Sequence, residues 1–364
     1  MSSALERFQT IWHKISQGYS QPPMSLAILQ SRVDLNLSAG GPLKQNAQYF
    51  QVRINELHLS KTREWFTTYQ PFVFVFSEFI YDNKIEAVPF IVGPSLIEKH
   101  GQPAPQGMIF ANTRVAGLHP YRGGKLNLSI LLCRIKNKNY VKELLQLTEN
   151  AASVLDFSTA LTSYLKIGNV LLDGIESLFN LGDTQSLIGL RQEFDPDAGD
   201  NMQPGYFALI DTPETQFNPN YFWVRNNQLL YGMTSASAKP FREADYVLYS
   251  LVQTSERQDV ALLPFYSSYE DVKAWASKTD KESWEQAKAS MSGLYQEMVK
   301  SPDLISSQMR KLVNQYVAEM RQLRKMAIGL GALGTADEFD IGEIDETNTE
   351  ANLANATRIL DLKL

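Results

Sequence analysis

The segment "PFVFVFSEFIY", residues 71–81, is the part of the chain that most directly indicates a fold. Successive side chains of a strand point to opposite faces, so Phe72, Phe74 and Phe76 share one face. Val73 and Val75 occupy the other face. A short run that is apolar on both faces is typical of a buried strand. The segment therefore predicts a central strand, covered on both sides.

Five more segments around this one have the composition of strands. They are rich in β-branched and aromatic residues and are separated by turn-forming sequences such as "SAGGP", "YDNK" and "HPYRGGK". With the central segment, the six predicted strands are residues 24–37, 48–60, 71–81, 84–93, 107–117 and 125–136. Since no helical pattern interrupts them, they predict an antiparallel β-sandwich with an immunoglobulin-like or a C2-like topology.

Apolar residues at helical spacing occur before and after these strands. The first 20 residues predict an amphipathic helix with an apolar face of Leu5, Phe8, Ile11, Trp12 and Ile15. Residues 140–181 predict two buried central helices that are broken near Gly168, because few charged residues interrupt the apolar pattern. A small second β unit then follows, with predicted strands at residues 206–211, 221–232 and 245–256 and a hairpin turn at Asn226–Asn227.

The last helical part of the chain has two sequences typical of helix starts. Thr279 and Glu282 have the spacing of a capping box, and Ser301 precedes Pro302 and Asp303 as an N-cap precedes its first turn. They predict a helical hairpin. The sequence as a whole predicts an α+β protein with five parts, at residues 1–20, 21–138, 139–266, 267–332 and 333–364.

Charge is distributed unevenly along the chain. Of the 40 acidic and 34 basic residues, eight acidic and two basic ones lie in residues 333–364, which leaves 32 of each in the remainder. A body without net charge has no overall field that attracts a polyanion, so nucleic acid is not expected as a partner. The same neutrality gives little resistance to self-association.

Two further features bear on location. Cys133 is the single cysteine, which fits a reducing compartment. No apolar run reaches the roughly 18 residues that a membrane span needs, and the N-terminal sequence lacks the apolar stretch of a secretory signal. The sequence therefore predicts a cytoplasmic protein.

A G-x-G-x-x-G pattern is formed by Gly329, Gly331 and Gly334. A dinucleotide-binding turn needs a strand before these glycines and a helix after them. Here a long helical pattern precedes them, and an acidic sequence that would repel a pyrophosphate follows. The glycines therefore predict the end of a helix, and no cofactor is expected.

Other candidate catalytic residues have ordinary structural interpretations. The four histidines lack metal-ligand spacing, and Cys133 alternates with Leu131 and Ile135 as a buried strand residue does. Ser163 and Lys166 match S-x-x-K without its companion motifs. The sequence "QEFDPDAGDN" lacks the spacing of a calcium loop and predicts a solvated turn. Arg122 and Lys125 flank two glycines in a predicted hairpin connection.

The C-terminal residues 333–364 have the pattern of a docking tail. Seven acidic residues between Asp337 and Glu350 alternate with Phe339, Ile341 and Ile344. Charge keeps such a segment extended while a few apolar side chains bind. In the closing stretch Leu360, Leu362 and Leu364 alternate with polar residues, as in a strand that adds to a partner's sheet.

These features predict a non-catalytic, bacterial-type protein that binds other proteins through its tail, as an adaptor, scaffold or complex subunit. One alternative is a hydrolase that uses Asp195, Asp197 or His119. Another is a peripheral membrane protein or pore-forming effector that exposes the helix at residues 151–181. Surface-seeking helices usually carry more Lys and Arg than this one, so a membrane partner is not expected.

Overall fold

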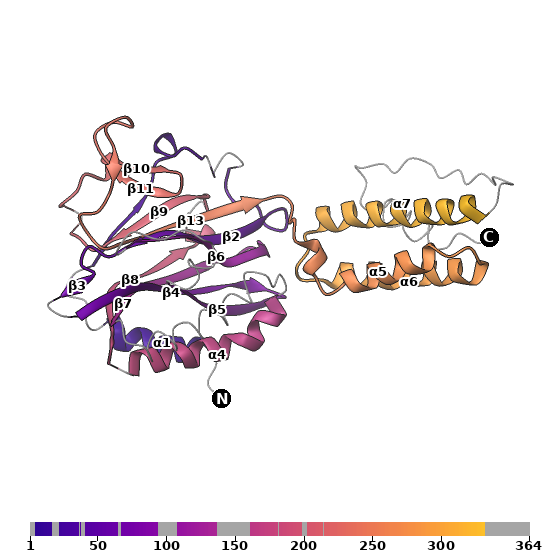
Figure 1. Cartoon of the computed structure of the whole chain (residues 1–364), viewed down its shortest axis with the longest axis horizontal. Coiled ribbons are helices and arrows are strands. Elements are labelled where there is room, and N and C mark those ends of the chain that lie inside the picture. The colour runs from indigo at the N-terminus through magenta and orange to yellow at the C-terminus, as the bar shows by residue number, and fades with distance from the viewer. Residues whose placement is uncertain are drawn as a thin grey trace. The chain divides into compact units, whose positions relative to one another are not determined.

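The computed structural model describes residues 4–16, 22–35, 37, 41–64, 67–93, 108–136, 161–180, 182–198, 202–213 and 215–331. The chain forms two units, Met1–Leu262 and Leu263–Leu364, here called the β unit and the helical unit. The fold is α+β, with antiparallel sheets in the β unit and helices at the C-terminal end of the described chain (Figure 1). Short 3-10 helices occur at Gln30–Arg32, Pro196–Ala198, Pro219–Tyr221 and Val260–Leu262.

The segment at residues 71–81 lies within strand β4 (Thr67–Tyr81), the centre of one sheet. β4 pairs with β5 (Lys84–Val92) on one side and with β7 (Leu126–Lys136) on the other. β7 also pairs with β8 (Thr184–Phe194), and β3 (Arg63–Glu64) pairs with the beginning of β4. The prediction of a central strand is therefore confirmed.

A second sheet has the order β1 (Met24–Ala27), β9 (Gly205–Ile210), β13 (Tyr246–Thr254), β2 (Tyr49–His58) and β6 (Met108–Pro120). Residues 206–211 and 245–256 were expected in a separate β unit, and this prediction is wrong. β9 and β13 instead lie between β1 and β2: β9 pairs with β1, β13 pairs with β2, and the two pair with each other. Strand order across some 150 residues of sequence depends on tertiary packing, which local patterns do not encode.

Both faces of β4 are buried, each against a different layer. On one face Phe79 meets Phe50 of β2 at a ring-centroid distance of 5.2 Å, so the two sheets share a core. On the other face Phe76 stacks on Phe8 of helix α1 (Ala4–Ser16) at 3.9 Å. The predicted N-terminal amphipathic helix is thus confirmed, with Phe8 and Ile11 buried.

Helix α4 (Leu161–Asn180) lies beside α1 on this outer face of the sheet (Figure 1). Its sheet-facing residues Leu171, Leu172, Ile175 and Leu178 are fully buried. Arg7 of α1 pairs with Asp173 and Glu176 of α4 at 2.7 and 3.1 Å. α4 continues through Gly168, so the predicted break there is wrong. The part of the prediction at residues 140–160 lies outside the described residues.

A small sheet covers the outer face of the second sheet (Figure 1). It consists of β10 (Phe222–Arg225), β11 (Gln228–Tyr231) and β12 (Lys239–Pro240). Asn226 and Asn227 have φ angles of 52° and 61°, the conformation of a two-residue hairpin turn, which confirms the predicted turn. Phe222, Val224 and Leu229 pack against Tyr246 and Leu248 of β13 in a second apolar cluster.

The helical unit contains α5 (Tyr266–Ala276), α6 (Lys281–Lys300) and α7 (Ser306–Gly331). The predicted two-helix hairpin is therefore a three-helix arrangement. Its core includes Tyr269 of α5, stacked on Tyr316 of α7 at 3.7 Å, together with Leu294 and Met298 of α6. No helix among the described residues is both long and apolar enough to cross a bilayer.

Both predicted helix starts in this unit are displaced. The N-cap of α6 is Asp280 rather than Thr279, because the Asp280 carboxylate accepts the backbone N–H of Ser283 at 2.7 Å. Ser301 is the C-cap of α6, not the N-cap of the next helix. α7 begins only at Ser306, after a short turn that contains Pro302 and Asp303.

Candidate functional site

A buried polar site in the described β unit centres on Glu56 of β2, whose side chain is fully buried. Ile54 and Leu57, three residues apart, both lie in the core between the sheets. The register with β13 shows the cause: Tyr249 opposes Ile54 and Leu248 opposes Glu56, so Asn55 is an extra residue. This β-bulge turns Glu56 away from the inter-sheet core, toward the small sheet.

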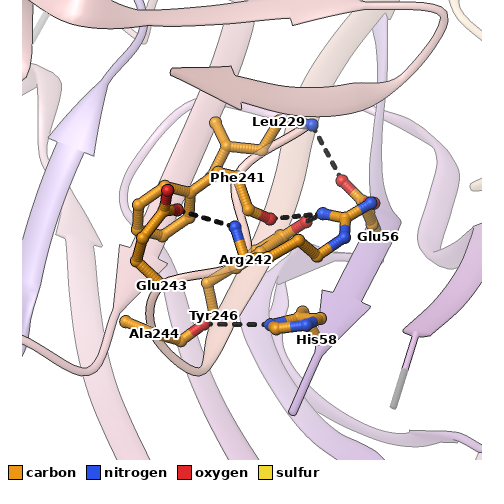
Figure 2. A network of polar contacts seen from close by, with 8 residues as sticks. All are labelled: Glu56, His58, Leu229, Phe241, Arg242, Glu243, Ala244 and Tyr246. Carbon is orange, nitrogen blue, oxygen red and sulfur yellow. Dashed lines mark hydrogen bonds and ion pairs between the residues drawn. The ribbon is translucent and has the colours of Figure 1, made fainter. Parts of the chain in front are cut away.

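Three polar groups from residues much later in the sequence surround the Glu56 carboxylate (Figure 2). Oε2 accepts the backbone N–H of Leu229 at 2.8 Å, and Oε1 lies 3.4 Å from Nη2 of Arg242. The Tyr246 hydroxyl is a third polar group beside the carboxylate, and it acts to lower the pKa of Glu56. Arg242 in turn donates through Nη1 to the Tyr246 hydroxyl at 2.7 Å and to the carbonyl of Phe241. Glu56 thus joins β2 to β11 and to the segment that enters β13.

Burial and hydrogen bonding act in opposite directions on the acidic groups of this site. Burial raises the pKa of Glu56, while the hydrogen bonds from Leu229 and Tyr246 and the charge of Arg242 oppose that rise. Burial also raises the pKa of Tyr246 well above its ordinary value, so its hydroxyl is protonated at neutral pH. Tyr246 can therefore act as a hydrogen-bond donor to the carboxylate.

His58 extends the site along β2. Its Nδ1 lies 3.0 Å from the carbonyl oxygen of Ala244, and because a carbonyl only accepts, Nδ1 is assigned the hydrogen (Figure 2). The ring stacks on Tyr246 at 5.4 Å. Burial lowers the pKa of His58, which favours the neutral imidazole. His58 therefore anchors the same segment that Glu56 holds.

A carboxylate, an imidazole, a phenol and a guanidinium together are the side chains of many acid–base sites. In this site the hydrogen bonds of these groups connect them to one another or to the backbone of residues 229–244. The arrangement supports an attachment of the small sheet to β2. Glu56 was not among the residues predicted from the sequence, although it leaves one signal there by interrupting the strand pattern "VRINELHL".

Asp195, a candidate hydrolase residue, is engaged in a turn. Its Oδ2 lies 2.7 Å from Nζ of Lys125, and its Oδ1 accepts the backbone N–H of Asp197 at 3.0 Å. Glu193 contacts the same ammonium group, and the two carboxylates raise the pKa of Lys125. Asp197 itself is exposed. Asp195 therefore closes a local turn and neutralises Lys125.

The loop that contains Arg122 and Lys125 differs from its prediction. It joins β6 to β7, and these strands belong to different sheets. The connection is therefore a crossing between sheets and not a hairpin. Arg122 donates from Nη1 to the side-chain oxygen of Asn46 at 3.2 Å, a contact that holds the loop against the segment before β2.

His119, the other hydrolase candidate, lies in the core between the sheets. Its ring stacks on Phe79 at 4.8 Å and meets the edges of Phe50 and Tyr81. Burial, with a smaller effect of the charges of Arg257 and Arg114, lowers the pKa of His119 to about 3. Its Nδ1 has no hydrogen-bond partner among the described residues. His119 and Asp195 therefore have separate surroundings, and the hydrolase interpretation gains no support.

His119 makes the stability of the β unit depend on pH. The unfolded chain binds a proton at His119 below about pH 6.5, whereas the folded chain does not until about pH 3. The contribution of the neutral ring is therefore present above pH 6.5 and is lost as the pH falls. The variant His119→Phe keeps an aromatic ring and loses no hydrogen bond at Nδ1. We expect that in this variant the free energy of unfolding no longer falls by the about 1.4 kcal/mol per pH unit that His119 causes below pH 6.5.

Urea unfolding of both proteins between pH 7.5 and pH 5 measures this difference. The two unfolding free energies should diverge progressively in favour of the phenylalanine variant as the pH falls. Parallel curves across that range would show that His119 is protonated normally in the folded chain.

The other candidates occupy structural positions. Cys133 is fully buried in β7, as predicted, and burial raises the pKa of its thiol well above the usual range. Ser163 and Lys166 lie in α4, but their side chains are outside the described part of the structure. Gly329 and Gly331 lie in the last turn of α7, so a helix and not a strand precedes the G-x-G-x-x-G pattern. Gly334 lies outside the described residues.

The predicted docking residues Phe339, Ile341, Ile344, Leu360, Leu362 and Leu364 all lie beyond residue 331, outside the described part of the chain. Among the residues that the structure does describe, no group of three or more His, Cys, Asp or Glu side chains is arranged to hold a metal ion. No family model matches this chain, and no curated protein matches its sequence.

Proposed function

We propose that this chain is a non-catalytic, cytoplasmic protein of bacterial type that binds other proteins as an adaptor, scaffold or complex subunit. In this proposal the β unit is a rigid β-sandwich scaffold, and residues 333–364 are an acidic docking tail. The observation that carries the proposal is the end of α7, which extends past the helices it packs on and leads directly into the tail.

The contacts of Arg324 locate this end. Its Nη1 donates to the carbonyl oxygen of Asp280 at 3.1 Å, next to the first residue of α6. The residues of α7 after Arg324 therefore extend beyond the beginning of α6. Two of them, Met326 and Ile328, are apolar and 52% and 40% exposed. These two side chains are available for contact with a partner.

The two alternative functions have weaker support. For the hydrolase that would use Asp195, Asp197 or His119, Asp195 is paired with Lys125 and His119 is enclosed by aromatic rings in the core. The membrane effector would need α4 to leave the sheet, although Leu171, Leu172 and Ile175 are fully buried there. Releasing those side chains into water would cost about 1.5–3 kcal/mol for each one.

Binding through the tail can be tested with three immobilised proteins in a lysate of the source cell. They are the full chain, a chain that ends at Leu333, and a full chain in which Phe339, Ile341 and Ile344 are serine. The serine variant keeps every tail charge, so it separates apolar docking from electrostatic attraction. We expect the full chain to retain a partner at least about tenfold better than either altered protein, since three buried apolar anchors exceed the 1.4 kcal/mol that a factor of ten requires.

A partner retained equally by all three proteins would bind elsewhere and would remove the tail from the proposal. The masses of the full and truncated chains in solution, measured by light scattering, form the second readout. A dimer of the full chain that dissociates on truncation would identify a second copy as the partner.

A further inference from the structure

The charge of α7 is opposite to that of the sequence that follows it. α7 contains five basic residues and one acidic residue, Glu319. Residues 337–350, here called the acidic segment, contain seven acidic residues and no basic one. Opposite charges on neighbouring parts of one chain attract each other at ordinary ionic strength.

Several basic side chains of the described helices lie at one end of the helical unit. This basic end consists of Lys278 in the α5–α6 connection, Lys281 at the start of α6, and Arg321, Arg324 and Lys325 in α7. Arg324 ties the two parts together, because its Nη1 donates to the carbonyl oxygens of Lys278 and Asp280. Carbonyl groups carry no net charge, so these bonds leave the guanidinium charge in place.

Few carboxylates offset this charge. Asp280 and Glu282 lie at the same end, and Asp280 is occupied with capping α6 through Ser283. Lys281, Arg321 and Lys325 form no ion pair with any residue in the described chain. Three uncompensated positive charges therefore remain at the basic end.

Aromatic and apolar side chains complete this surface. The ammonium group of Lys278 lies 3.8 Å from the centre of the Trp275 ring, and the guanidinium of Arg324 lies 5.6 Å from that of Trp284. Ile328 follows Arg321 and Lys325 on the same side of α7, at spacings of seven and three residues. A ligand that matches this surface is acidic and carries a few apolar side chains.

The acidic segment fits this description and is close enough to bind. Asp337 is the sixth residue after Gly331, so the chain between them can span at most about 20 Å. Arg321 lies ten helical residues before Gly331, a distance of about 15 Å along the axis. The effective concentration of a segment tethered so closely is on the order of millimolar.

We propose that the acidic segment binds the basic end of its own chain, with its carboxylates on Lys325 and Arg321 and its apolar side chains against the tryptophans and Ile328. This inference deepens the proposed function, since a partner that docks on the tail must first displace it. The tail contact itself is a property of the isolated chain and is measured without a partner.

Tryptophan quenching of a fluorophore tests this contact directly. The full chain carries Gly342→Cys, labelled with bimane, a dye that tryptophan quenches on contact. Cys133 is fully buried and stays unlabelled under native conditions. Emission should be low near 50 mM salt, where charges attract, and should recover near 1 M salt, where the Debye length is about 3 Å.

Matched variants identify the surface. Lys325→Glu should weaken the contact about fivefold, as reversal of one exposed charge does. Lys300→Glu reverses an exposed charge at the other end of α6 and should leave emission unchanged. Replacing Trp275 and Trp284 with phenylalanine should abolish quenching. The emission of this variant is therefore the reference value for the unquenched dye.

Three outcomes would overturn the proposal. They are emission at low salt equal to that of the phenylalanine variant, equal effects of Lys325→Glu and Lys300→Glu, and quenching that grows with protein concentration. The last would show that a second copy supplies the tail. Quenching without partner capture would uphold this inference while removing the proposed function, and capture without quenching would do the reverse.

Discussion

Glu56→Ala is expected to lower the free energy of unfolding of the β unit by about 3–5 kcal/mol, the cost of removing one member of a buried ion pair. The change leaves the guanidinium of Arg242 and the backbone N–H of Leu229 without the carboxylate that accepts them. It also empties a fully buried position beneath the small sheet. Urea unfolding at pH 7 measures the loss.

Two controls make this result specific. Glu56→Gln keeps an oxygen that can accept the Leu229 N–H but removes the charge that faces Arg242, so an intermediate loss is expected. Glu193→Gln alters a half-exposed carboxylate on Lys125 and should change stability little. Tryptophan fluorescence reports on the β unit alone when Trp275 and Trp284 of the helical unit are phenylalanine. If Glu56→Ala unfolded at the wild-type urea concentration, the site would not hold the small sheet.

Phe76→Ala is expected to destabilise the β unit by a similar amount, about 3–5 kcal/mol. Phe76 is fully buried in β4, and its ring lies 3.9 Å from that of Phe8, nearly parallel to it. Removing the ring therefore leaves a cavity between the sheet and α1. The same urea experiment measures the effect.

The neighbouring strand offers the control for this change. Ile85 of β5 is 72% exposed, so Ile85→Ala removes a similar kind of side chain without leaving a cavity and should have almost no effect. Equal losses from the two substitutions would mean that Phe76 is not packed as described. Hydrogen exchange in α1 gives a second readout, because only Phe76→Ala should loosen that helix.

Local sequence patterns were sufficient to predict elements whose apolar residues lie at a regular spacing, and turns whose residues are adjacent in the sequence. The run of residues 71–81 that is apolar on both faces predicted β4 as a central strand, and the spacing of Phe8 and Ile11 predicted α1. The turn at Asn226–Asn227 followed from residues that tolerate positive φ. Each of these signals lies within the element that it describes.

Non-local features could not be predicted in this way. The Glu56 carboxylate meets Leu229, 173 residues later, and the bulge that points it there comes from pairing with β13. In the sequence, the only sign of these two features is a charged residue, Glu56, within a strand pattern. The N-cap of α6 illustrates a different difficulty, since Thr279 and Asp280 are adjacent candidates and only the structure shows which side chain accepts the Ser283 N–H.

The interleaving of β9 and β13 between β1 and β2 has a consequence for biosynthesis. A ribosome delivers β1, β2 and β6 long before Thr254, yet β2 lacks one of its two neighbours until β13 has emerged. During that interval the nascent chain presents an unsatisfied strand edge, of the kind that invites aggregation and chaperone binding. Because β13 pairs with both β2 and β9, this sheet can close only after residues 246–254 have been synthesised.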